Sequence, residues 1–349
     1  MRKFYLFAVL FLASLSAFAG NPDRQGEAGA YELLLNPFAR SAGLASMQTA
    51  NVSGAEAMRI NVAGIGRVNG LEVNVSNMQY LVGSDINMNA LGIASQTKDG
   101  GAFAITIAAL TFNDIALTTT AAPEGTGSTF SPTFFHIGLG YSKTFEDKIS
   151  VGVGVRFISE RIFNASAVGF AIDAGVQYVS GEQDEFKLGI SLRNVGLSMR
   201  FSGDGILEQF AEPADGRFQI TARNNIDDFE LPFQLNIGTS YDVNIDQDNK
   251  VTLIANFTSN AFSRDNLGGG LEYSFRDLFM VRGGYNAEVG VASGSFEAPL
   301  TRAFAAGATA AIPLGGADSG RKRYVYVDYA FRPTRFFDGN HNIGIRLNL

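Results

Sequence analysis

The sequence predicts an all-β protein, a transmembrane antiparallel β-barrel of about 14 strands. Three observations predict this class. Stretches of about ten residues alternate between apolar and polar side chains. Short and long connections alternate between these stretches. The composition combines 40 glycines and 29 phenylalanines with no cysteine, no tryptophan and only 9 prolines, in a chain without helical periodicity.

The first element is a predicted secretory signal peptide over residues 1–19. Arg2 and Lys3 form a charged n-region, an apolar run follows from Phe4 to Leu15, and Ala17-Phe18-Ala19 provides a small-x-small cleavage site. The apolar run is too short for a membrane-spanning helix, which needs about 20 apolar residues. We therefore expect an exported protein whose barrel lies in the outer membrane of a Gram-negative cell.

Fourteen stretches then follow the period-two pattern of strands. In residues 150–158, SVGVGVRFI, the valines and Phe157 share one face, while the glycines and Arg156 share the other. Asp173 and Gln177 lie on the polar face of residues 168–179. An isolated Asp is costly in a sandwich core but not in a polar lumen, so we expect the apolar face to meet lipid. The stretches cover 71–76, 86–94, 102–110, 135–145, 150–158, 168–179, 186–195, 231–241, 251–259, 267–275, 278–286, 302–312, 324–331 and 341–349.

The connections favour a membrane barrel over a soluble sandwich. Outer-membrane barrels alternate short periplasmic turns with longer extracellular loops. Here tight turns such as TKDGG, EDK and RD alternate with long tracts at 112–133, 196–230 and 287–300. A Greek-key sandwich has no reason to keep this order. The connection over residues 313–323 is longer than its expected periplasmic place requires.

Residues 28–68 resemble a known family. They contain Glu32-Leu33-Leu34, then Ala39-Arg40 with Ala42-Gly43, and Asn61-Val62-Ala63-Gly64 just before the first strand. This order is similar to the N-terminal signature of the FadL-like barrels of Bacteroidetes, and more closely to the PorV/PorQ family of the type IX secretion system. Val62 stands where that family usually has proline. The resemblance continues through the later stretches in the family's order and covers nearly the whole mature chain.

The resemblance implies an architecture and a role. It implies a FadL-like barrel over residues 67–349, with residues 20–66 folded into the lumen as a plug. The best-known members of the family bind the C-terminal domain of secreted proteins and pass them to surface-attachment machinery. Inside a barrel, polar and charged groups pair with each other. We therefore expect Glu32, Arg40, Arg59 and Asn61 to make the contacts between plug and lumen.

The long tract over residues 196–230 mixes apolar with acidic side chains, which a merely solvated loop would not keep. Two interpretations remain open: the tract packs over the barrel mouth as a lid, or it presents a binding surface for a partner. The apolar residues on which both depend are Ile206, Leu207, Phe210, Phe218 and Ile220.

The composition excludes several kinds of chemistry. The absence of cysteine excludes thiol nucleophiles and cysteine metal sites, and two histidines make a zinc site implausible. A Ser-His-Asp arrangement would have to use His341 and Asp338, which lie among turn residues. The net charge of −7 argues against nucleic acid as a partner. We expect no enzyme activity, no catalytic residue, no cofactor and no bound metal.

These observations lead to two hypotheses about function. The first is a component of the type IX secretion system, which binds secreted proteins with a C-terminal secretion domain, or translocon and surface-attachment proteins, through its extracellular loops. The alternative is a FadL-like transporter of hydrophobic small molecules. It would need an apolar pocket beside the plug and a place where a strand kinks, for which Gly283-Gly284 is a candidate.

Overall fold

The computed structural model describes residues 20–211, 219–223, 226–291, 299–314 and 323–349. The predicted signal peptide and Phe218 lie outside these residues. Every helix in the described part of the chain is too short or too polar to cross a membrane.

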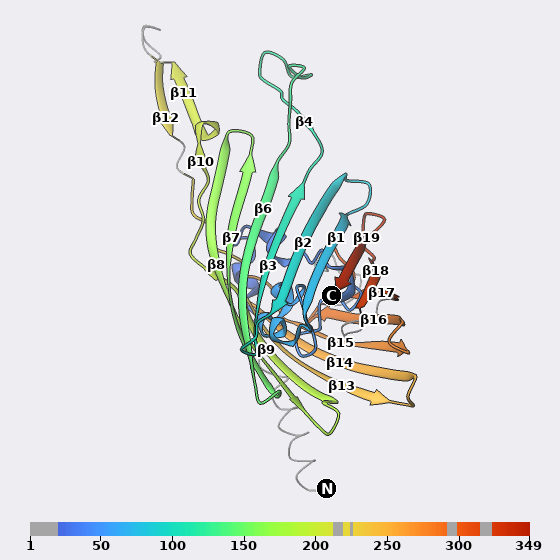
Figure 1. Cartoon of the computed structure of the whole chain (residues 1–349). Helices are drawn as coiled ribbons and strands as arrows, with labels where there is room; N and C mark the ends of the chain where they lie inside the picture. The colour runs from blue at the N-terminus through green and yellow to red at the C-terminus, as the bar shows by residue number, and fades with distance from the viewer. Residues whose placement is uncertain (1–19, 212–218, 224–225, 292–298, 315–322) are drawn as a thin grey trace.

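A ring of 14 antiparallel strands forms the body of the molecule (Figure 1). Each strand pairs with the next along the ring, β8 pairs with β9, and β1 pairs with β19 to close it. The predicted fold class is confirmed, and each predicted stretch overlaps one strand. The strands are β1 (Leu71–Tyr80), β2 (Ile86–Gln96), β3 (Gly101–Thr111), β6 (Thr133–Phe145), β7 (Ile149–Ile162), β8 (Ala165–Ser180), β9 (Phe186–Gly196), β13 (Gln234–Asn244), β14 (Asn249–Asn260), β15 (Asn266–Phe275), β16 (Phe279–Glu288), β17 (Phe304–Leu314), β18 (Arg323–Arg332) and β19 (Asn340–Asn348).

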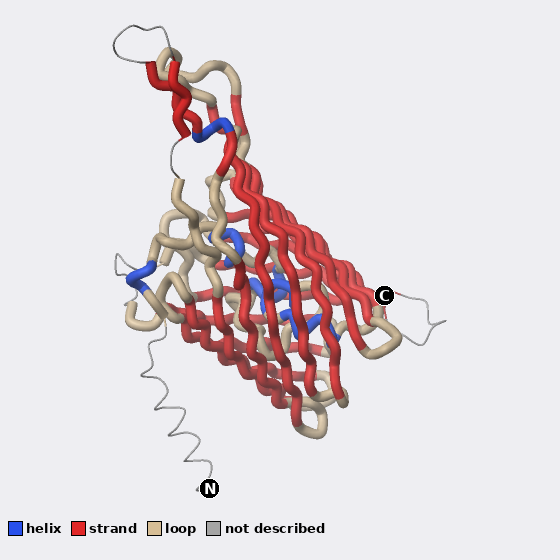
Figure 2. Tube along the Cα trace, turned by 90° about the vertical axis from the view of Figure 1, so that its left-hand side faces the viewer, coloured by secondary structure: helices blue, strands red, loops and turns tan. Residues whose placement is uncertain are grey.

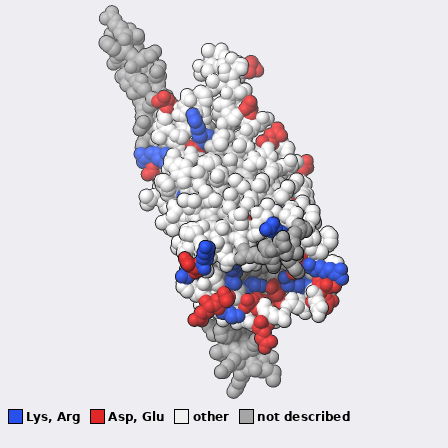
Figure 3. Space-filling model, in the orientation of Figure 1, with Lys and Arg blue, Asp and Glu red and all other residues white. Residues whose placement is uncertain are grey.

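The apolar face of the wall points outward, as predicted. In β7, Val153 is 55% exposed, whereas the neighbouring Arg156 is 3% exposed and lies inside. Asp173 and Gln177 of β8 are likewise buried on the lumen side. Charged side chains gather toward the two ends of the face seen in Figure 3 and leave a band without charge between them. This outer surface suits the hydrocarbon layer of a membrane.

The wall is taller on one side than on the other. Strands β6, β7 and β8 have 13, 14 and 16 residues, whereas about 9–11 suffice to span a bilayer. Two small hairpins continue this side beyond the rim (Figures 1 and 2). One pairs β4 (Ile115–Ala116) with β5 (Thr129–Phe130). The other follows β10 (Ser202–Gly203) and η5 (Asp204–Ile206) and pairs β11 (Leu207–Ala211) with β12 (Gln219–Arg223).

The position of the β11–β12 hairpin bears on the two interpretations of the long tract. The hairpin stands above the rim in line with β8 instead of lying over the barrel mouth (Figure 1). The hairpin points this way because β10, which leads into it, pairs with the start of β8 and so continues the sheet. Near the two ends of the long tract, Met199 and Phe229 exchange backbone hydrogen bonds.

Most of the segment before β1 lies inside the ring, where short helices are visible in Figure 2, whereas Asp23 and residues 25–27 are exposed at its edge. We call residues 20–70 the plug. It contains η2 (Pro22–Arg24), η3 (Tyr31–Leu34), α2 (Ala39–Ala42), α3 (Ala57–Ile60) and η4 (Val62–Arg67). The helix η4 packs against β6, β7 and β8, and α2 packs against β17 and β18 on the opposite side. The plug therefore spans the lumen and contacts the wall on opposite sides.

Inward-facing glycines bring the wall close to the plug. A Cβ atom on Gly152 would lie 2.6 Å from the Val62 carbonyl, and one on Gly189 would lie 2.2 Å from the Thr49 oxygen. In LGGG of β15, Gly268 and Gly270 face Met47 and Leu44. Much of the glycine content is explained by this close approach.

One break in strand register occurs among the described barrel strands. It lies between β8 and β9, where Asn194 has a positive φ of 58° and its amide donates to Asp173 Oδ1 at 2.7 Å. The register of β15, β16 and β17 is continuous through Gly283-Gly284. The candidate kink site at these two glycines has no break in register, and the bulge in the described wall lies between β8 and β9.

Candidate functional site

The plug is held mainly through its backbone. Polar side chains of the wall donate to its carbonyl oxygens: Ser142 Oγ to Ala63 at 2.8 Å, Ser191 Oγ to Ile60 at 2.9 Å, and Asn342 Nδ2 to Pro37 at 2.9 Å. The plug is made of short helices and turns, so many of its carbonyl groups lack partners within the segment. The wall satisfies these groups with inward Ser and Asn side chains. The alternation of each strand predicts that such residues face inward, but not which carbonyl they reach.

Glu32 and Asn61, two of the four predicted contact residues, bond directly to the wall. Glu32 Oε1 lies 3.3 Å from His136 Nε2 of β6, and both side chains are buried. Burial raises the pKa of the Glu32 carboxyl above its ordinary value, since the charged form loses its hydration. Asn61 Nδ2 donates to the carbonyl oxygen of Val176 in β8 at 3.1 Å and to that of Thr49 at 2.8 Å.

Arg40 and Arg59, the other two predicted residues, mainly bind within the plug. Arg59 donates to the carbonyl oxygens of Glu32 at 2.7 Å and Leu35 at 2.8 Å. Arg40 Nη1 lies 3.4 Å from Glu56 Oε1. Burial raises the pKa of the Glu56 carboxyl, and the nearby Arg40 charge opposes this rise only in part. These arginines therefore organise the plug more than they attach it.

A further link between wall and plug was not predicted as a site. Arg156 Nη2 of β7 lies 2.6 Å from Asp173 Oδ2 of β8 and also donates to the Met58 carbonyl oxygen at 2.9 Å. Its Nη1 donates to Asn194 Oδ1 at 2.6 Å. The sequence places Arg156 and Asp173 on the inner face, but only the register of the two strands brings them together.

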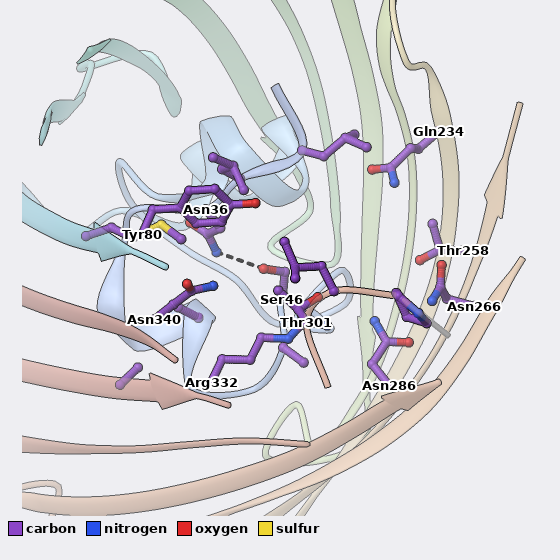
Figure 4. A pocket seen from close by; sticks show the side chains of 18 of the residues that line it. Asn36, Ser46, Tyr80, Gln234, Thr258, Asn266, Asn286, Thr301, Arg332 and Asn340 are labelled. Atoms are coloured by element: carbon purple, nitrogen blue, oxygen red, sulfur yellow. Dashed lines mark hydrogen bonds between the residues drawn. The ribbon is translucent and has the colours of Figure 1, made fainter. Parts of the chain in front are cut away.

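A cavity of about 310 Å³ lies between the plug and the ends of strands β13 to β19 on the side of the long loops (Figure 4). The plug contributes Leu34 to Asn36 and Ser46 to its lining. Polar side chains from the wall point into the same space. Eight lining residues are Asn or Gln: Asn36, Gln234, Asn236, Asn260, Asn266, Asn286, Asn340 and Asn342. We call this cavity the amide pocket.

Part of the amide pocket is held by internal hydrogen bonds. Asn36 Nδ2 donates to Ser46 Oγ at 3.0 Å, Gln234 Nε2 donates to Asn260 Oδ1 at 2.7 Å, and Thr258 Oγ1 donates to Asn236 Oδ1 at 2.7 Å. Other polar atoms have no hydrogen-bond partner within the described part of the chain. They are Asn236 Nδ2, Arg193 Nε and Asn286 Oδ1.

The predicted loop residues do not reach the amide pocket's described lining. Ile206 is half-buried in η5, and Phe210 is the register partner of Ile220 across the β11–β12 hairpin. Leu207 begins β11. The part of the long tract that does enter the barrel was missed: Leu231 packs against Leu33 of the plug, close to Met199.

No group of His, Asp and Glu side chains within the described ranges could hold a metal ion. His341 bonds through Nδ1 to the Tyr329 hydroxyl at 2.7 Å and packs on Phe331.

The fold is shared with solved outer-membrane channels. The "CymD monoaromatic hydrocarbon channel" matches with a TM-score of 0.52 and 13% identity, over 90% of this chain and 97% of that one. The "P. putida toluene transporter TodX" matches with a TM-score of 0.53 and 11% identity, over 90% and 98%. The fold is FadL-like. No protein-family model matches the sequence, and no curated protein does either. Neither neighbour is similar enough in sequence to carry more than the fold.

Proposed function

We propose that this FadL-like barrel lies in the outer membrane and captures small molecules in the amide pocket, as the first step of uptake. The amide pocket carries this proposal, because a cavity of ligand size is lined by polar side chains from both the plug and the wall. The hydrocarbon channels that share the fold support small-molecule uptake over protein secretion. They also support hydrophobic substrates, the class named in the sequence-based alternative. We propose no catalytic step and no cofactor.

Ligand binding to the purified full chain in lipid nanodiscs tests this proposal. Saturation-transfer NMR with toluene and with a panel of simple sugars covers an apolar and a polar class, and empty nanodiscs correct for partition into lipid. Asn286→Phe fills the amide pocket from the wall side. We expect signals from at least one class, and their loss in Asn286→Phe. If neither class binds, small-molecule capture is wrong.

A second candidate function is the type IX role, in which the loops bind secreted proteins, a translocon component or a surface-attachment protein. The observation that favours it is the paired β11–β12 hairpin, which stands beyond the rim and offers strand edges to a partner. Affinity purification from native outer membranes, with and without residues 207–223, tests this candidate. Secreted proteins with a shared C-terminal domain should co-purify with the full chain and not with the shortened one.

A further inference from the structure

We propose that the amide pocket binds a neutral, hydroxyl-rich molecule of the mono- or disaccharide class. This inference rests on the proposed capture of small molecules and names the ligand class of the same site. It departs from the hydrocarbons named for the channels that share the fold. The reason lies in the chemistry of the lining in this chain.

The lining contains many groups that match hydroxyls, beside apolar side chains such as Leu34, Leu35 and Met78. An Asn or Gln side chain offers both a donor and an acceptor, and a hydroxyl group also does both. Eight such amides surround one cavity, and Ser, Thr and Tyr hydroxyls stand between them. A hydrocarbon placed there would displace water from these amides without replacing its hydrogen bonds, which is unfavourable. A sugar would replace those bonds.

Three residues of the lining each carry one polar atom without a partner among the described residues. Asn236 Nδ2 of β13 and Arg193 Nε of β9 are donors without an acceptor among the described residues, and Asn286 Oδ1 of β16 is an acceptor without a donor there. Asn236 and Arg193 are themselves 6% and 8% exposed. Buried polar groups left unpaired are rare in folded proteins and call for a partner. As the side chains stand, all three atoms are closed to the cavity, so ligand hydroxyls meet them only when these side chains turn toward it.

The lining carries charges of both signs. Arg193 and Arg332 are the cations of the described lining, and Glu288 places a carboxylate in the same cavity. Arg332 Nε is already engaged with the carbonyl oxygen of Arg302 at 3.1 Å. The cavity of about 310 Å³ lies at the lower end of ligand sites, which suits one or two sugar rings. Tyr80 and Phe331 supply apolar ring surface at its edge.

The test compares ligand classes on the full chain in nanodiscs. The probes are glucose, galactose, N-acetylglucosamine and maltose as neutral ligands, galacturonic acid as an anionic one, and toluene as an apolar one. The variants Asn236→Ala and Asn286→Ala each remove one proposed ligand contact. Asn256→Ala is the matched control, since Asn256 is a buried lumen amide with one unpartnered oxygen but lies outside the lining.

We expect at least one neutral sugar to bind more strongly than galacturonic acid or toluene. Each pocket variant should weaken that binding, on the order of fivefold to tenfold for the loss of one hydrogen bond, and Asn256→Ala should not. Preference for toluene or galacturonic acid overturns the ligand class and leaves small-molecule capture standing. Sugar binding that all three variants leave unchanged overturns the assignment to this pocket. Absence of binding by every probe contradicts both proposals.

Discussion

Single residues in the lumen are held by charge pairing that water does not screen. Arg156 and Asp173 are each about 3% exposed and satisfy each other together with Asn194. Exposed pairs at the turns are different, because solvent weakens them: Arg276 and Asp248 lie 2.9 Å apart with both side chains open to water. An arginine–aspartate pair therefore contributes more to stability in the lumen than at an exposed turn.

Asp173→Ala should destabilise the barrel strongly. It leaves the Arg156 guanidinium buried without its carboxylate, which costs about 3–5 kcal/mol in the free energy of unfolding. Asp248→Ala, the exposed control, should cost about 1 kcal/mol or less. Urea unfolding of the refolded chain in lipid vesicles, followed by circular dichroism, measures both. Equal losses for the two variants would mean that burial does not decide the strength of the pair.

Glu56 should make stability depend on pH. Burial raises the pKa of its carboxyl in the folded chain above the unfolded value of about 4.3, so the folded state holds the proton to higher pH. The protonated carboxyl of Glu56 contributes its full share of the free energy of unfolding at a pH below the unfolded pKa. This contribution is lost as the pH rises through the pKa of the folded chain.

The variant Glu56→Gln isolates this effect. The free energy of unfolding of Glu56→Gln minus that of the parent chain should increase as the pH rises from 4 to 8. Gln183→Ala, at an exposed turn, should show a constant difference over the same range. A constant difference for Glu56→Gln would show that Glu56 has the same pKa in the folded and unfolded chain.

At the scale of elements, the plug and the wall fit each other through small residues. The inner faces of several strands present glycine where the plug backbone passes, and the outer faces present large apolar side chains. Because side chains alternate along a strand, each strand contacts the plug on one face and presents apolar side chains on the other. The plug itself has little regular structure and depends on wall side chains to satisfy its carbonyl groups.

Gly189→Val should displace the plug. Its Cβ would lie 2.2 Å from the Thr49 oxygen, a contact that only backbone movement can relieve. Gly269→Val places the same side chain on the outer face of β15, where the nearest atom to its Cβ is 3.4 Å away. Hydrogen exchange of amides in residues 44–66 should become faster in Gly189→Val and stay unchanged in Gly269→Val. Unchanged exchange in both variants would contradict the close seating of the plug.

At the scale of the whole molecule, the long connections from β3 to β6 and from β9 to β13 leave the barrel at the same end. Barrels of this type place their longer loops outside the cell, so the amide pocket and the two projecting hairpins face the exterior. The taller wall of β6 to β8 carries those hairpins away from the pocket. Partner binding and small-molecule capture would therefore use separate parts of one end.

Cysteine labelling tests this orientation. Because the chain has no native cysteine, a label can attach only at the introduced cysteine. Ser128→Cys lies in the long connection between β3 and β6, and Asp99→Cys lies in the short turn between β2 and β3. A membrane-impermeant maleimide should label Ser128→Cys on intact cells and Asp99→Cys only after permeabilisation. The reverse pattern would invert the barrel and place the amide pocket in the periplasm.

The sequence by itself determined the strands, their faces and their alternating connections. These features follow from local physics: side chains alternate along a strand, and a lipid-facing wall needs an uninterrupted apolar face. Asp173 and Gln177 were enough to orient the whole wall, because a carboxylate and an amide cannot face lipid.

The tertiary structure alone decided which inward groups meet. The pairing of Arg156 with Asp173 depends on strand register, the contact of Glu32 with His136 depends on how the plug folds, and the amide pocket gathers side chains from strands far apart in the sequence. The direction of the β11–β12 hairpin likewise follows from the pairing of β10 with β8. Such long-range contacts are set by the closed ring, and no local pattern in the chain encodes them.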